Sequence, residues 1–238
     1  NIFQFGIWPS ADFVLKVGGV YQIQNSNSGG GYSDTTVQLG LQLVDEGLYT
    51  PAAKLYVIQS FPSGKFQRGK ERKQGLDITG NGSYITSLSF NTAKVIWWMS
   101  TNPMNLRLTF FFDVYSSDIS VNGINAYGGV ASTNGKIQRG HEMKLIFGYE
   151  ASLSKKLVFA LDVAYAYQDA SLFQGNPGQN TDGTQSSVGA QSNDSLSLAP
   201  ALEYNIDSNS GLLAGLWFSV YGRNQNDFLA GIFTYQVT

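Results

Sequence analysis

The residues of this chain that could do chemistry are few. Its 238 residues contain no cysteine and one histidine, His141, which is followed by Glu142. Histidine is the usual base in acid–base and nucleophilic catalysis, but no serine partner can be placed beside His141 by its spacing. One His and one Glu are also too few ligands for a metal ion. We therefore expect no enzyme activity, no catalytic residue, no metal site and no cofactor, and interpret His141 as a rim residue.

Two pairs of opposite charge indicate another use for polar side chains. Arg107 with Glu150 and Asp113 with Lys144 give the same sum of residue numbers. Directly opposed residues of two antiparallel strands have a constant sum, so one register would match both pairs on one face. Such pairs either brace the wall that the strands form or take part in a transverse field that screens solutes.

The strands that must position these charges follow from a two-residue rhythm. In 157–168, large apolar residues alternate with small or polar ones, which gives a strand one apolar and one polar face. Strands of nine to eleven residues are long enough to cross a hydrocarbon core when tilted. The same rhythm marks about eleven segments: 2–8, 12–25, 35–45, 53–61, 82–93, 104–115, 142–153, 157–168, 194–205, 212–223 and 227–237. The pattern predicts an all-β fold: a transmembrane antiparallel β-barrel of a Gram-negative outer membrane, with one domain over 1–238.

Composition supports this class and excludes others. Charged residues make up 13% of the chain, against roughly 25% in soluble domains. The mean hydropathy of −0.12 and the lack of an apolar run near twenty residues exclude a helical membrane protein. A net charge of −2 provides no basic field for nucleic acid. A soluble β-sandwich is the alternative fold, and it would need a second sheet to cover every apolar face.

The connections between the segments alternate between short and long, except for a tight turn near 222–226. Outer-membrane barrels place short turns in the periplasm and long loops outside. An even strand number is usual in such barrels, so we predict twelve strands with the first missing from this chain. The polar stretch 174–193 is expected to be mobile, either folding into the mouth or receiving a partner. The Gly29–Gly31 run is expected to be a flexible loop.

The polar faces supply the predicted pore lining: Gln38, Gln42, Arg107, Asp113, Lys144, Glu150, Asp162, Glu203 and Arg223. A second set of charges lies in the long basic loop 62–81, where lipopolysaccharide phosphates are the nearest polyanion. The candidates for lipopolysaccharide contact are Lys65, Arg68, Lys70, Arg72 and Lys73. The alternative for this loop is that it is simply a solvated charged surface.

Several stretches carry a resemblance to a known family. They are Phe61-Pro-Ser-Gly-Lys-Phe66, Gly80-Asn-Gly-Ser-Tyr84, and 198–204 followed by 215–224. Over roughly residues 60–238 the chain resembles the outer-membrane family assigned to transport in the meta-pathway of phenol degradation. The resemblance implies a β-barrel that passes hydrophobic or aromatic compounds, and it supplies no catalytic residues.

The sequence thus predicts an integral outer-membrane channel for small solutes, including hydrophobic or aromatic ones. Its expected partners are outer-membrane lipid, lipopolysaccharide and a small-molecule solute. The main alternative is a structural or adhesive surface protein whose barrel is filled by side chains, since twelve strands lie between filled eight-stranded barrels and open sixteen-stranded porins.

Overall fold

The computed structural model describes residues 2–24, 26–99, 102–116, 118–207 and 209–237. Its main element is a sheet of eleven strands, each antiparallel to its neighbours. In spatial order these are β1 (Ile2–Trp8), β2 (Ala11–Lys16), β5 (Thr35–Val44), β6 (Ala52–Phe61), β7 (Ile85–Met99), β8 (Asn102–Tyr115), β11 (Glu142–Ser152), β12 (Leu157–Gln168), β14 (Asn193–Asn205), β15 (Ser210–Arg223) and β16 (Leu229–Val237). The prediction of an all-β antiparallel architecture is confirmed, and each of the eleven predicted segments overlaps one of these strands.

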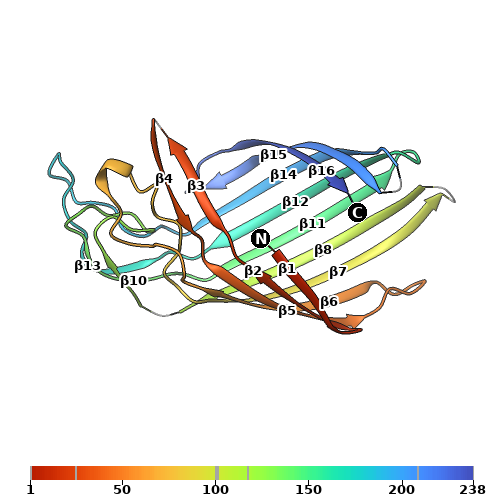
Figure 1. Ribbon diagram of the computed structural model, residues 1–238, viewed down its shortest axis with the longest axis horizontal. Helices are drawn as coiled ribbons and strands as arrows, with labels where there is room; N and C mark the ends of the chain where they lie inside the picture. Colours follow the sequence, from red (N-terminus) through yellow and green to blue (C-terminus); the bar gives the residue numbers. More distant parts are fainter. Residues whose placement is uncertain (1, 25, 100–101, 117, 208, 238) are drawn as a thin grey trace.

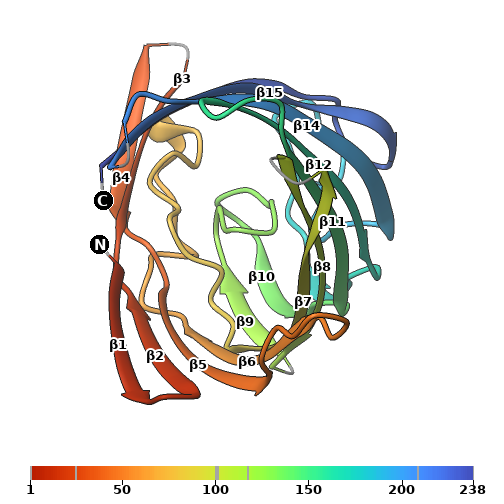
Figure 2. The ribbon, with the colours of Figure 1, turned by 90° about the vertical axis from the view of Figure 1, so that its right-hand side faces the viewer.

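The sheet curls into an incomplete barrel (Figures 1 and 2). Strands β1 and β16 are the two edge strands and flank the gap in the barrel. No hydrogen-bonded pairing between them is found in the described residues. Because the sheet has eleven strands in strict antiparallel order, β1 and β16 run in the same direction. Long connections gather at one end of the barrel, called here the long-loop end, and short turns at the other, the short-turn end.

The predicted segment 12–25 is not one strand. Strand β2 ends at Lys16, and the chain then forms a separate hairpin of β3 (Gly19–Gln24) and β4 (Asn27–Tyr32). The glycine run expected to be a flexible loop is part of β4, and it serves close packing. A Cβ on Gly29 would lie 2.5 Å from the backbone carbonyl of Leu76. A further difference is that much of 94–103, expected as a connection, extends β7 and β8.

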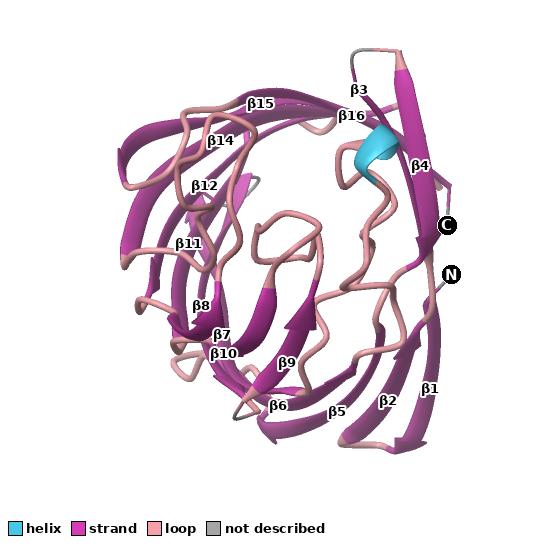
Figure 3. Ribbon diagram, turned by 90° about the vertical axis from the view of Figure 1, so that its left-hand side faces the viewer, coloured by secondary structure: helices cyan, strands magenta, loops and turns pink. Residues whose placement is uncertain are grey.

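Three long connections, 62–84, 116–141 and 169–192, form a folded unit at the long-loop end, called here the cap (Figure 3). It contains β9 (Ile119–Asn122), β10 (Asn134–Gln138) and β13 (Leu172–Asn176) in one small sheet, and the short helix η1 (Glu71–Lys73). Ile119, Val121 and Ile137 form its core, with relative exposures of 5%, 2% and 0%. Phe66 and Phe173, from the other two connections, pack against this core.

Backbone hydrogen bonds join the three connections to one another. The Arg68 N–H donates to the Asn122 carbonyl at 3.0 Å, and the Gly189 N–H donates to Tyr127 at 2.8 Å. Strand β13 pairs with β10 over its full length. The stretch 174–193, expected to be mobile, is therefore tied into the cap by β13 and by these backbone bonds.

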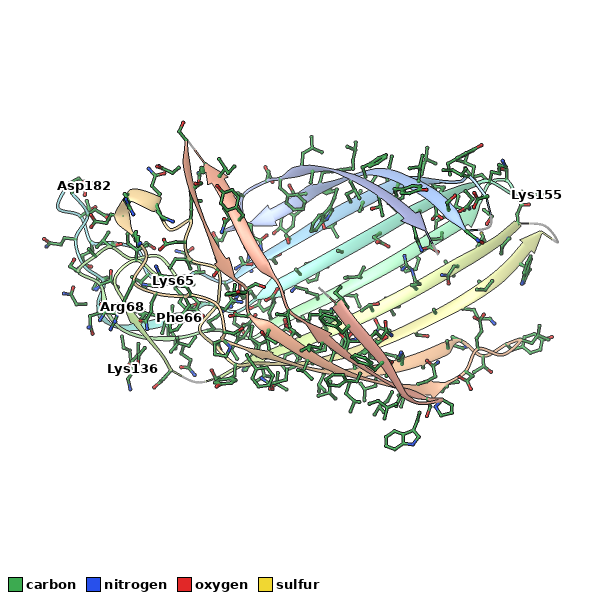
Figure 4. The ribbon with its side chains drawn as sticks, in the orientation of Figure 1. Lys65, Phe66, Arg68, Lys136, Lys155 and Asp182 are labelled. Atoms are coloured by element: carbon green, nitrogen blue, oxygen red, sulfur yellow. The ribbon has the colours of Figure 1, made fainter. Side chains whose placement is uncertain are left out.

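The main sheet has the opposite distribution of apolar residues. Its large side chains on one face are exposed, including Leu88, Leu108, Phe110 and Leu145 at 38–49% relative exposure. Figure 4 shows side chains projecting outward around the barrel. No helix in the described residues is long and apolar enough to span a membrane.

Candidate functional site on the polar face of the sheet

Residues paired across neighbouring strands share a face, so the registers decide which predicted pore residues lie together. Arg107, for example, lies opposite Gly148, which lies opposite Asp162. Eight of the nine predicted residues lie on the face opposite the exposed apolar side chains. They are Gln38, Gln42, Arg107, Asp113, Lys144, Glu150, Asp162 and Glu203.

The register of β8 against β11 differs from the prediction by two residues. Glu142 lies opposite Asp113, and Gly148 lies opposite Arg107. Because side chains alternate with a period of two, a shift of two leaves every residue on its predicted face. Arg107 still forms an ion pair with Glu150, diagonally, with Nη2 2.8 Å from Oε1. Lys144 instead pairs with Glu142 of its own strand, at 2.7 Å.

Gly148 determines the geometry around Arg107. The Arg107 side chain crosses the middle strand β11 to reach Asp162 of β12, with Nη2 3.5 Å from Oδ1. A Cβ on Gly148 would lie 2.8 Å from this Oδ1 and 3.1 Å from Arg107 Nε. The missing side chain therefore opens the path by which one guanidinium reaches Asp162 while also pairing with Glu150.

A second ion pair repeats this arrangement on β2, β5 and β6. Lys54 pairs with Asp12 across the middle strand, over Gly40. A Cβ on Gly40 would lie 2.5 Å from Asp12 Oδ1 and 3.0 Å from Lys54 Cε. This site was not predicted from the sequence, because 53–61 is the least regular of the eleven segments. The available signal was a glycine at an inward position, Gly40, on the strand between two opposite charges.

Arg223 lies on the face opposite to the one predicted. The ladder between β14 and β15 contains a bulge, in which Leu196 pairs with Tyr221 and Ser197 with Ser219. The extra residue, Val220, reverses the faces of the residues that follow it. Arg223 consequently pairs with Asp194 at 2.6 Å, in the same row as Tyr167 on the apolar face. The pore-lining prediction for Arg223 is corrected by this bulge.

Aromatic and charged groups meet where the polar face reaches the cap. The Tyr115 hydroxyl donates to Glu142 Oε2 at 2.7 Å. The Arg139 guanidinium lies over the Tyr115 ring, 4.0 Å from its centroid, and 5.7 Å from that of Tyr127 in the cap. His141 stacks against Phe112 with the ring centroids 5.7 Å apart, which fits a rim residue.

The predicted lipopolysaccharide residues lie in or near η1 at the long-loop end, where Figure 4 labels Lys65 and Arg68. Lys65, Lys70 and Lys73 line a cavity of about 350 Å³ beside the β3–β4 hairpin. Lys65 forms an ion pair with the buried Asp77, which also accepts from the Lys70 N–H at 3.2 Å. Burial raises the pKa of Asp77, but these two hydrogen bonds outweigh it and lower the pKa below its ordinary value. Arg68 and Arg72 do not line this cavity.

Comparisons with known proteins are consistent with this architecture. No protein-family model and no curated protein matches the chain. Among solved structures, an outer membrane channel from Pseudomonas putida F1 is similar, with a TM-score of 0.64 over 98% of this chain and 79% of that chain at 10% sequence identity. The chain therefore has the fold of an outer-membrane channel, which agrees with the family resemblance at the level of fold. No group of three or more His, Cys, Asp or Glu that could hold a metal ion occurs in the described residues.

Proposed function

We propose that this protein is an outer-membrane channel for small solutes, including hydrophobic or aromatic compounds. The observation that supports it is the division of the sheet into two faces. Exposed Leu and Phe side chains suit lipid, while ion pairs such as Arg107–Glu150 lie on the inner face. Two inward side chains, Lys54 and Arg107, pass over Gly40 and Gly148 to reach carboxylates of the wall, which favours an open passage over a filled barrel.

The proposal includes closure of the barrel by one further strand. Strands β1 and β16 run in the same direction, so one antiparallel strand between them would pair with both and give an even total. Closure also satisfies the backbone groups of both edges, which a hydrocarbon core requires. We place the short-turn end in the periplasm and the cap outside the cell, in contact with lipopolysaccharide.

A surface-binding role is the second candidate, and the cap supports it. A loop unit with its own core, including the fully buried Ile137, is more structure than a connection between strands requires. Lys70 and Lys73 at the cavity beside the hairpin offer positive charge to lipopolysaccharide phosphates. This role is compatible with a channel, because the cap and the polar face occupy different parts of the molecule.

Solute flux through reconstituted protein tests the channel. Liposomes containing the full-length chain are mixed with isosmotic arabinose, and swelling is followed by light scattering. We expect swelling above that of empty liposomes, and a slower rate for Thr109→Trp, which places a large side chain on the polar face. The control is Leu108→Trp, which places it on the lipid face. Equal rates for protein-containing and empty liposomes would contradict the proposal.

A further inference from the structure

We propose that the channel prefers cations, and that the two ion pairs that span glycines set this preference. The inference rests on the proposed channel function and specifies its substrate class: small solutes carrying a positive charge. It starts from the distribution of charge along the polar face. In the half nearer the short-turn end, the described strands carry four acids and two bases: Asp12, Glu150, Asp162 and Glu203 against Lys54 and Arg107.

The excess acid is confined to this half. Nearer the cap, the same face carries Lys16 and Lys144 against Asp113 and Glu142, which is an even balance. A solute crossing the barrel therefore meets a neutral stretch followed by an acidic one. A cleft lined by one sign of charge raises the local concentration of ions of the opposite sign.

Gly148 lets the positive charge of Arg107 lie between two carboxylates of the wall. Because Gly148 has no side chain, Arg107 lies across β11 with its guanidinium between Glu150 and Asp162. One positive charge thus faces two carboxylates, and the cluster keeps a formal charge of −1. The Asp162 side chain is 48% exposed, so its charge is accessible from the passage.

Gly40 has the same effect at the opposite part of the wall. Lys54 is held on Asp12, whose side chain is 13% exposed, so this pair contributes no net charge. Glu203 then adds an acid close to the short-turn end, where it lines a polar cavity of about 90 Å³ with Asp207. Both bases of this half are thus bound to carboxylates, so the Arg107 cluster keeps one net negative charge and Glu203 adds a second to attract cations.

The test is the reversal potential of the full-length chain in a planar bilayer under a KCl gradient. We expect the wild type to prefer K⁺ over Cl⁻. We expect Asp162→Asn and Glu203→Gln each to lower this preference about two- to fourfold, since each removes one charge that salt only partly screens. The double variant Glu150→Gln/Asp162→Asn leaves Arg107 unpaired and should move the preference toward anions.

Gly148→Ala tests the role of the glycine itself. The added methyl group pushes the guanidinium off Asp162, so we expect smaller conductance steps and a weaker preference for K⁺. Gly6→Ala is the matched control, because Gly6 lies on the same face, opposite Asp12, with no atom within 4 Å of an added Cβ. Folding of each variant is checked by its heat-dependent gel mobility.

The outcomes separate this inference from the proposed function. Conductance without a preference for K⁺, or with a preference that the carboxylate variants leave unchanged, would overturn the inference and leave the channel standing. The absence of any conductance from inserted wild-type protein would instead overturn the channel. If Gly148→Ala has the same conductance and K⁺ preference as Gly6→Ala, Gly148 does not set the position of the Arg107 charge.

Discussion

The barrel wall and the cap use apolar residues in opposite ways. In the wall, Leu108 is 42% exposed and Phe110 is 38% exposed, whereas in the cap Ile137 is fully buried. The wall is one sheet with its apolar side outward, and its large side chains there are exposed. The cap folds its small sheet against Phe66 and Val188 and buries its apolar residues internally. Under the proposed function, we therefore expect the wall, but not the cap, to depend on the membrane for stability.

The largest expected effect is in the cap core. Ile137→Ala should destabilise the cap by about 2–5 kcal/mol, because a fully buried side chain leaves a cavity. The wall should be unaffected. Limited proteolysis of reconstituted protein should show faster cleavage within the cap, with unchanged heat-dependent gel mobility of the barrel. Leu172→Ala is the control, since Leu172 is 62% exposed and should change neither. Loss of the mobility shift in Ile137→Ala would show that cap and wall are not independent.

The next prediction perturbs the wall instead of the cap, by a substitution on its apolar face. Leu108→Arg should destabilise the inserted barrel by about 2–4 kcal/mol, the range for a positive charge near the bilayer midplane. Thr109→Arg is the control, because its side chain lies on the polar face of the same strand. Denaturant unfolding in liposomes measures both. Equal stabilities for the two variants would contradict the assignment of the faces.

A smaller effect is expected from backbone strain in the cap. Gly178 has a φ of +79°, and an added Cβ would lie 2.6 Å from Ser132 Oγ. Gly178→Ala should therefore cost about 1–3 kcal/mol in cap stability. Gly183 has a similar φ of +82° but no atom within 4 Å, so Gly183→Ala separates strain from crowding. The Gly178 variant should be cleaved faster, and the reverse order would contradict the packing described.

The smallest effect is the dependence of the cap on pH. The lowered pKa of Asp77 means that the folded cap favours the charged carboxylate. Its contribution to stability is full above the ordinary aspartate pKa of about 3.9 and is lost as the pH falls through the lower folded value. Protease sensitivity of the cap should increase between about pH 4 and 3, and Asp77→Asn should flatten this dependence. An identical pH profile for both proteins would exclude Asp77 as the cause.

The same contrast explains how much of the structure could be predicted. Alternation in 157–168 and similar segments reveals the wall, because each residue's face depends only on its position along a strand. The predicted register of Arg107 was wrong by two residues, and alternation could not reveal this because a shift of two residues preserves every face. The bulge at Val220 does not interrupt the alternation of residue types, so the predicted face of Arg223 was wrong. The cap was missed because its core joins Ile119, Ile137 and Phe66, which lie in three separate segments of the sequence.

The measurement that tests the central claim most directly is single-channel recording of the purified, full-length protein in a planar bilayer. The account predicts discrete and stable conductance steps, with a step size that changes in Arg107→Ala, where the Glu150 and Asp162 carboxylates lose their shared cation. The absence of conductance steps from protein whose insertion is shown by its heat-dependent gel mobility would contradict an open passage and favour a filled, structural barrel.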